Sequence, residues 1–363
     1  MAAVHTGERT PSAAPPSLPV TFYLADEPDV AGISRLDPDV DLDAFRPGEL
    51  SWVAQTYLRL RNAGFPVALQ STPPERGLVV FHAKHKHALA RQASGRRGLI
   101  FVAIRADNSS PLLADFEVLQ SGRFADDRDR FWIPFWPQPG LVPRDPARGT
   151  TLQRVAYMGR IENLHPEFRG EGWRQALAAL GLEWVLREVR FAKGAGARPG
   201  GSSRNGKSSC GETRIDWEDY RTLDAVIAVR PFEPHLYFAK PASKLINAWR
   251  AGVPALVGPE FASREIRRTD DDFLEVADAG AALAALRRLR DDPELYSRIV
   301  AAGHRRAPEF SFAALTAQWA RLLFETLPQR VAVGGLPWSH RLPLSLRIPL
   351  RRAVRLLRAA RKR

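Results

Sequence analysis

The sequence predicts an α/β protein built from two domains, each with a parallel sheet. Its 363 residues exceed the roughly 250–300 residues at which single cores stop growing. Continuous apolar runs at 20–24, 77–82 and 99–104 suit parallel strands that are buried on both faces. A second series of such runs starts at 154–159, after a proline-rich passage over 131–144 that is typical of an interdomain connection.

The chain divides where its composition changes. Residues 1–19 are rich in proline, alanine and serine, which predicts a disordered lead. Residues 20–150 and 151–328 are expected to form an N-terminal and a C-terminal Rossmann-like domain. Within the second domain, the glycine, serine and basic stretch 192–214 is typical of a flexible loop. Residues 329–363 form a basic tail.

Regular elements follow from the spacing of the apolar residues. Leu50, Val53, Tyr57 and Leu60 recur at helical spacing, and Gly64 stands where a helix would end, so a helix is predicted over about 50–62. In the second domain the apolar runs predict further strands, and one segment between them predicts a helix. These strands are 181–187, 224–230 and 253–257, and the helix is 241–251.

Composition narrows the class of protein. Hydrophobic residues make up 45% and charged residues 26% of the chain, which is ordinary for a folded globular protein. No apolar run reaches the ~18 residues of a membrane span, and the N-terminus lacks the order of a secretory signal, so we expect a cytoplasmic protein. Cys210, the single cysteine, excludes an internal disulfide and a multi-cysteine zinc site.

The net charge of +13 is concentrated near the C-terminus. Residues 341–363 contain nine lysines or arginines and no acidic residue. The rest of the chain shows no helix-turn-helix or zinc pattern, so we expect no nucleic-acid partner. In a helix, Leu350, Val354 and Leu357 would share one face, with arginines on another, which suits an anionic membrane surface; a solvated tail is the alternative. These arginines are Arg351, Arg355 and Arg358.

The most informative segment is 225–260. A predicted strand ends at Arg230, a connection leads to Lys240, and Lys244 follows in the first turn of the next predicted helix. A helix N-terminus with these cations, at the carboxyl edge of a parallel sheet, can bind a diphosphate. Glu260, on the loop after the next strand, could accept hydrogen bonds from a ribose. A plain helix between two strands is the alternative.

This segment resembles the donor-binding region of known enzymes. The run KPASKLINAWRAGVPALVG over 240–258 is similar to that of GT-B glycosyltransferases and to the Glu-Lys-Leu-x-Asn-Ala segment of fucosyltransferases. The resemblance implies two Rossmann-like domains facing across a cleft, with Lys244 binding the nucleotide diphosphate. Ser243 and Asn247 stand where these families carry glutamate, which leaves open retention or inversion and the ribose ligand.

Two further segments resemble GT-B landmarks. Residues 157–160, with Gly159 and Arg160, are similar to the glycine-bearing first loop of the donor domain. Residues 310–325 are similar to its closing helix. The GlyLysSer sequence at 206–208 lacks the preceding glycine and strand of a Walker phosphate loop.

Candidates for the general base lie at the carboxyl ends of the first domain's strands. Asp26 follows the first strand and is the leading candidate, and His82 ends the strand 77–82. Neighbouring loops also carry His85 and Asp107. An aspartate that merely caps a turn is the alternative for Asp26.

No metal ion and no cofactor are expected. The histidines in 82–87 do not share one helical face and alternate with lysines, and the Asp-x-Asp over 39–43 lies in a polar loop. The resemblance therefore predicts a metal-independent transferase that moves a sugar from a nucleotide sugar to a glycan or lipid-linked acceptor. It would act in polysaccharide or glycoconjugate synthesis, as a peripheral protein of the inner membrane face. The alternatives are a noncatalytic nucleotide-sugar-binding protein and a nucleotide-sugar epimerase of the same fold.

Overall fold

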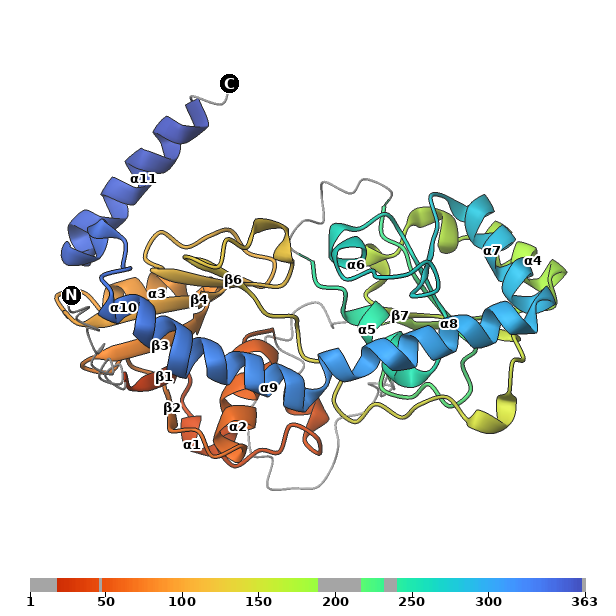
Figure 1. Cartoon of the computed structure of the whole chain (residues 1–363), viewed down its shortest axis with the longest axis horizontal. Coiled ribbons are helices and arrows are strands. Elements are labelled where there is room, and N and C mark those ends of the chain that lie inside the picture. The colour runs from red at the N-terminus through yellow and green to blue at the C-terminus, as the bar shows by residue number, and fades with distance from the viewer. Residues whose placement is uncertain (1–17, 46–47, 189–216, 232–239, 361–363) are drawn as a thin grey trace, which may run out of the picture.

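The computed structural model describes residues 18–45, 48–188, 217–231 and 240–360. Two α/β domains lie next to each other, and the last part of the chain runs back from the second domain to the first (Figure 1). Most of the predicted disordered lead 1–19 and all of the predicted loop 192–214, with Cys210, lie outside the described residues.

The first sheet has six parallel strands in the order β2-β1-β3-β4-β5-β6. Their bounds are β1 Val20–Tyr23, β2 Val67–Gln70, β3 Gly77–His82, β4 Leu99–Ile104, β5 Phe116–Leu119 and β6 Arg130–Trp132. Every residue of β3 and β4 is buried, as their continuous apolar runs predict. A polar residue, Glu117, interrupts the apolar residues of β5. Strand β6 begins at Arg130, one residue before the segment predicted as a connection, and extends into it.

Helices cover both faces of this sheet. The predicted helix over 50–62 is present as a π-helical turn, Leu50–Ala54, that continues into α2, Gln55–Asn62. The other helices of this domain are α1 Val30–Ile33 and α3 Lys86–Gln92. Tyr57, Leu58 and Leu60 of α2 pack in the core with residues of β1, β3 and β4.

The second sheet has five parallel strands in the order β11-β10-β9-β7-β8. Their bounds are β7 Arg154–Gly159, β8 Glu183–Glu188, β9 Ala225–Ala228, β10 Ala255–Val257 and β11 Leu274–Glu275. The helices are α4 Glu171–Ala179, α5 Ser243–Ala251, α6 Phe261–Glu265, α7 Ala279–Asp291 and α8 Pro293–Arg306. The α/β fold with two parallel sheets is thus confirmed.

Short 3₁₀ turns connect many of these elements. They are Leu42–Phe45, Ala83–His85, Gly122–Phe124, Pro146–Arg148, Ile161–Asn163, Pro166–Phe168, Ala307–Phe310 and Trp338–Arg341.

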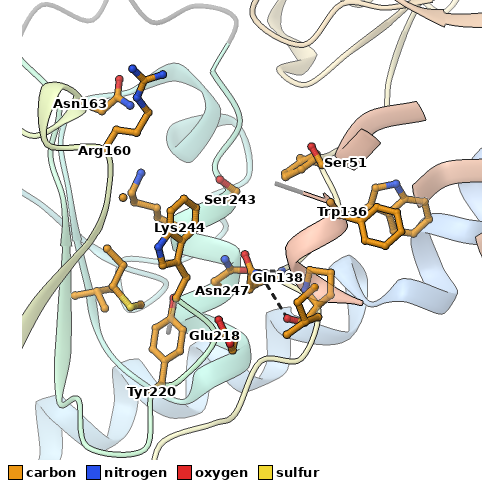
Figure 2. A pocket seen from close by; sticks show the side chains of 18 of the residues that line it. Ser51, Trp136, Gln138, Arg160, Asn163, Glu218, Tyr220, Ser243, Lys244 and Asn247 are labelled. Atoms are coloured by element: carbon orange, nitrogen blue, oxygen red, sulfur yellow. Dashed lines mark hydrogen bonds between the residues drawn. The ribbon is translucent and has the colours of Figure 1, made fainter. Parts of the chain in front are cut away.

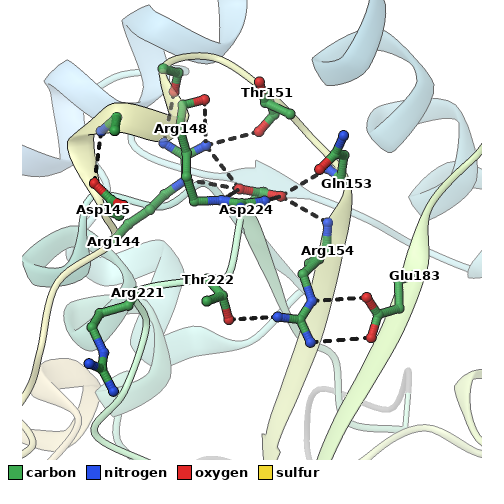
Figure 3. A network of polar contacts seen from close by, with 12 residues as sticks. Arg144, Asp145, Arg148, Thr151, Gln153, Arg154, Glu183, Arg221, Thr222 and Asp224 are labelled. Carbon is green, nitrogen blue, oxygen red and sulfur yellow. Dashed lines mark hydrogen bonds and ion pairs between the residues drawn. The ribbon is translucent and has the colours of Figure 1, made fainter.

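The connection between the domains is attached to the second domain by a buried carboxylate. Asp224 has no exposed surface, and its oxygens accept hydrogen bonds from the guanidinium groups of Arg144 and Arg148 at 2.8–3.1 Å. The backbone N–H groups of Gln153 and Arg154 donate to it at 2.9 Å (Figure 3). Although burial alone would raise it, hydrogen bonds from Arg148 and its neighbours lower the pKa of Asp224. The ionised carboxylate therefore joins the connection to the start of β7 and β9.

After α8 the chain crosses back to the first domain (Figure 1). This crossing segment comprises α9 Phe312–Ala320, a π-helical stretch Arg321–Thr326 and α10 Leu327–Ala332. Its buried side chains belong to the core of the first sheet: Leu315, Trp319, Ala320, Leu322, Leu323 and Leu327. The sequence-based domain 151–328 thus differs from the spatial one, because the apolar face of this segment packs on α2 rather than on the second sheet.

The predicted helical tail is α11, Leu344–Ala360, which projects from the first domain (Figure 1). In the part of the chain that the structure describes, no helix combines the length and the apolar character needed to cross a bilayer.

Candidate functional site

A cavity of about 330 Å³ lies between the two domains, which is within the usual range for a small-molecule site. Helix α5 and the loop after β7 form one wall, and residues of the first domain, including Ser51 and Trp136, form the other (Figure 2). Of the ten predicted site residues, five line it. They are Gly159, Arg160, Ser243, Lys244 and Asn247.

Lys244 and Gly159 meet at the edge of this cavity. Gly159 has φ +146°, and a Cβ atom there would lie 3.1 Å from both Lys244 Cε and the Tyr157 hydroxyl. The Lys244 ammonium also lies 5.4 Å from the centre of the Tyr157 ring, within range of a cation–π contact. The glycine therefore allows the lysine side chain to pass against the loop after β7.

The surroundings of Lys244 disfavour the charged form of its side chain. Burial, and then repulsion by Arg230, lowers the pKa of Lys244 from 10.5 to about 7, although Glu260 opposes the shift. An ammonium that has lost hydration in this way gains strongly from an anionic ligand. The site is thus prepared for negative charge.

Helix α5 adds backbone donors to the same wall. Pro241 and Ala242 precede the helix, and Ala242, at the N-cap, makes no side-chain cap hydrogen bond. The first N–H groups of a helix lack intrahelical partners and attract anions. Gly252 ends the helix at φ +70°, as the sequence predicts.

Arg230 and Glu260 form a buried pair beside Lys244. Arg230 donates to Glu260, which is 6% exposed. Both line a second, much smaller cavity of about 10 Å³ that also touches Lys244, enough space for about one water molecule. Burial raises the pKa of Glu260 although Arg230 and Lys244 oppose the shift.

The Glu260 carboxylate is directed at Arg230 and at the small cavity. It lines the small cavity and not the large one, because its loop turns the carboxylate inward to Arg230. The ribose role of Glu260 stays a prediction. In the described chain its Oε1 atom makes no hydrogen bond.

Asn247 and Lys240 make contacts between the domains. The Asn247 side-chain oxygen accepts a hydrogen bond at 2.9 Å from the backbone N–H of Gln138, in the connection (Figure 2). Lys240 donates to Asp107 of the first domain. Although burial alone would raise it, this contact lowers the pKa of Asp107. Lys240 is thus directed at the opposite domain rather than at either cavity.

The predicted bases lie outside both cavities. Asp26 is exposed, at the end of β1, with φ +55°, a conformation that aspartate tolerates. His82 is 5% exposed at the end of the neighbouring strand β3. Burial, and then His85, lowers the pKa of His82 to about 4.

The hydrogen bond of His82 disfavours a base role. Its Nδ1 atom accepts from the backbone N–H of Lys84 at 3.2 Å, and Nδ1 of His85 accepts likewise from Ala25 at 3.2 Å. A neutral imidazole that accepts at Nδ1 carries its proton on Nε2. Both histidines therefore present an N–H donor, and His82 as a general base does not fit this geometry.

Several lining residues escaped the sequence-based prediction. Asn163 touches both cavities, and Trp217, Glu218 and Tyr220 line the large one. Asn163 ends a 3₁₀ turn and the other three lie outside helices and strands, and none of them shows a recognisable spacing in the sequence. The only signal was two aromatic residues, Trp217 and Tyr220, a few positions before the strand 224–230. From the first domain, Gln55 and Trp136 complete the wall, and only the packing of the domains brings them there.

Across the described ranges, no three histidine, cysteine, aspartate or glutamate side chains gather where they could hold a metal ion.

No protein-family model matches the chain, and no curated protein matches its sequence. Solved structures do match. A sucrose-phosphate synthase from Thermosynechococcus elongatus superimposes with a TM-score of 0.53 at 13% identity, covering 87% of this chain and all of that one. The HepE protein of Anabaena in complex with UDP-glucose gives 0.52 at 12% identity, covering 84% and 99%. The same protein with UDP and glucose gives 0.50 at 11% identity and the same coverage.

The chain has the GT-B fold. The match extends over both domains, because 84–87% of the chain is covered. The GT-B architecture expected from residues 225–260 is therefore confirmed, and in that architecture the cavity beside α5 lies between the two domains.

Proposed function

We propose that this GT-B protein is a glycosyltransferase that moves a sugar from a nucleotide sugar to a glycan or lipid-linked acceptor. One observation carries the proposal: a half-buried lysine, Lys244, lies in the first turn of a helix that faces the interdomain cavity. The HepE structure that matches this chain contains UDP-glucose, which supports the same ligand class.

The diphosphate is proposed to lie between the N-terminus of α5 and the loop after β7. There Lys244 would contact a phosphate oxygen, and Arg160, on the same cavity wall, would contribute a second positive charge. Ser243 and the first N–H groups of α5 would donate hydrogen bonds. Arg230 would act through Glu260, which it holds next to Lys244.

Transfer is proposed to need no metal ion and no further cofactor. When the bond from the sugar to the diphosphate breaks, negative charge develops on the leaving phosphate. Fixed cations and backbone dipoles directed at that charge stabilise the transition state. Lys244, Arg160 and the α5 N-terminus are the groups that would do so.

The acceptor is proposed to approach from the carboxyl edge of the first sheet. Asp26, an exposed carboxylate there, remains the proposed general base. His82 and His85 would donate hydrogen bonds to acceptor oxygens, since both are neutral donors at neutral pH. We also propose that the enzyme works in the cytoplasm, at the inner membrane face, in synthesis of a surface polysaccharide or glycoconjugate.

Binding of the nucleotide tests the donor site directly. Purified protein is titrated by calorimetry and thermal shift with UDP, GDP, CMP, ADP and TDP in EDTA. We expect one nucleotide to bind and to raise the melting temperature. Lys244→Met, which keeps the side-chain volume, should weaken its binding by about ten- to hundredfold, the range for a lost charge-assisted hydrogen bond.

The matched control is Lys84→Met. Lys84 is exposed in the first domain and pairs with Glu49, and it does not line the cavity, so nucleotide affinity should not change. Equal affinity of Lys244→Met and wild type would refute the site.

Incubation with the nucleotide sugar then distinguishes the three activities. Transfer or slow hydrolysis supports a transferase, an isomerised donor supports the epimerase alternative, and an unchanged donor supports the noncatalytic alternative.

A further inference from the structure

Helix α11 presents two chemically different faces, and the arginine face is the one that packs on the protein. Leu344 is buried in a core cluster with residues of β3 and β4, and Ile348 packs against it. Arg347 is 5% exposed. Arg351 and Arg355 continue the same face, because these positions recur at helical spacing. Arg347 and Arg351 of the tail therefore face the protein, whereas Arg355 remains exposed.

A buried carboxylate holds this face. Asp115 has no exposed side-chain surface, and its oxygens accept from Arg351 at 2.9 Å and from Arg347 at 3.4 Å. His340, just before the helix, lies 3.2 Å away. Arg355 donates to the backbone oxygen of Ser110 at 3.1 Å. These contacts determine which side of α11 points outward.

The outward face (Leu346, Leu350, Ala353 and Leu357) is apolar. Leu346 is 58% exposed and Leu357 is 64% exposed. Leu356, beside this face, is also 64% exposed.

Exposed apolar side chains concentrate in this part of the described chain. Eight large hydrophobic side chains are strongly exposed, and five of them lie between 333 and 357. Surfaces of soluble domains rarely gather apolar side chains in this way unless they bind a partner.

Positive charge surrounds the outward face. Arg352 and Arg341 are exposed, whereas Arg347 and Arg351 pair with Asp115, and the sequence 341–363 contains no acidic residue. A second copy of the chain would bring these like charges together. An anionic bilayer instead accepts leucines into its acyl boundary and pairs the arginines with lipid phosphates.

We propose that the outward face of α11 docks on an anionic lipid bilayer. The helix lies in the interface rather than across the membrane, since its 17 residues are shorter than the ~20 that a span needs. Asp115 and its arginines hold the apolar side chains away from the protein, so the first domain attaches through α11 with a defined orientation.

Vesicle flotation tests this proposal with the full-length protein and without nucleotide, so that the result does not depend on the donor site. The vesicles are phosphatidylcholine alone or mixed with phosphatidylglycerol. We expect wild type to float with the mixed vesicles and not with phosphatidylcholine alone. Leu357→Glu should lower the bound fraction at least tenfold, and high salt should also reduce it.

The matched control is Val40→Glu, because Val40 is an exposed apolar residue of the first domain, at 73%, outside α11. It carries the same charge change and should bind as wild type. The proposal is overturned if wild type does not float with anionic vesicles, or if Leu357→Glu and Val40→Glu bind equally. It is also overturned if light scattering shows a dimer that Leu357→Glu dissociates while vesicle binding is unchanged.

Discussion

Lys244 shows how one side chain can connect burial to function. Its ammonium lies beside Arg230 and has lost hydration, so its pKa falls to about 7. A residue of this kind costs stability, and its charged form is stabilised when an anion binds. Its position depends on Gly159, which leaves no side chain between the loop after β7 and the lysine.

Gly159→Ala should therefore weaken nucleotide binding. The new methyl group would lie 3.1 Å from Lys244 Cε, and φ +146° is unfavourable for alanine. We expect at least a tenfold loss of affinity, together with a destabilisation of about 1–3 kcal/mol, measured by calorimetry and by urea unfolding.

Gly181→Ala is the control for this substitution. Gly181 also has positive φ, at +70°, but a Cβ atom there would meet nothing within 4 Å. It should cost about 1 kcal/mol of stability and leave the affinity unchanged. If both variants bind the nucleotide as wild type does, Gly159 does not position the lysine.

At the scale of elements, one buried carboxylate anchors the interdomain connection, together with backbone hydrogen bonds such as that from Val142 N–H to the Glu218 carbonyl at 2.8 Å. The Asp224 carboxylate accepts hydrogen bonds from the guanidinium groups of Arg144 and Arg148 and from two backbone N–H groups. This network attaches the connection to β7 and β9, so a hinge within this connection must lie before Arg144.

Asp224→Asn should strongly destabilise the second domain. It leaves two guanidinium groups beside a neutral amide in a buried site, which costs about 3–5 kcal/mol when one partner of a buried pair is lost. Urea unfolding followed by tryptophan fluorescence measures the loss. Asp219→Asn is the control, because Asp219 pairs with the exposed Arg221 and such surface pairs contribute about 1 kcal/mol or less. Equal losses would contradict a special role of Asp224.

At the scale of the whole molecule, the crossing segment joins the two domains. Residues 312–332 follow the second domain along the chain, yet their apolar side chains complete the core of the first. The ring of Phe324 stacks on Phe65 at 5.2 Å, and the Arg59 guanidinium lies 3.5 Å from the centre of the Phe312 ring. The first domain is therefore incomplete without the end of the chain.

Trp319→Ala tests this dependence. Trp319 is 2% exposed, and truncating a buried tryptophan costs about 3–5 kcal/mol. Hydrogen exchange should show faster exchange in β3 and β4 of the first domain, while β7 and β9 keep their protection. Trp338→Ala, at a position 68% exposed, should change neither. Loss of protection only in the second domain would contradict this assignment of the crossing segment.

Local patterns in the sequence predicted most of the helices and strands. Continuous apolar runs identified β1, β3, β4 and β7 because strands buried on both faces need apolar side chains at every position. The spacing of lysine, glycine and proline identified α5 and the place of Lys244. By contrast, β5 escaped prediction because the buried Glu117 interrupts its apolar residues. The ion-pair partner of Glu117, Arg105, lies in the loop after β4.

Only the tertiary structure decided which neighbours these residues meet. Periodicity predicted the helix α11 but not its outward face, because the carboxylate that binds its arginines, Asp115, lies more than 220 residues earlier in the chain. Likewise Glu260 turned inward to Arg230, and Gln55 and Trp136 reached the cavity, through packing between distant segments. Local sequence reports the hydrophobic pattern within an element, whereas burial and charge pairing depend on contacts that only the folded chain brings together.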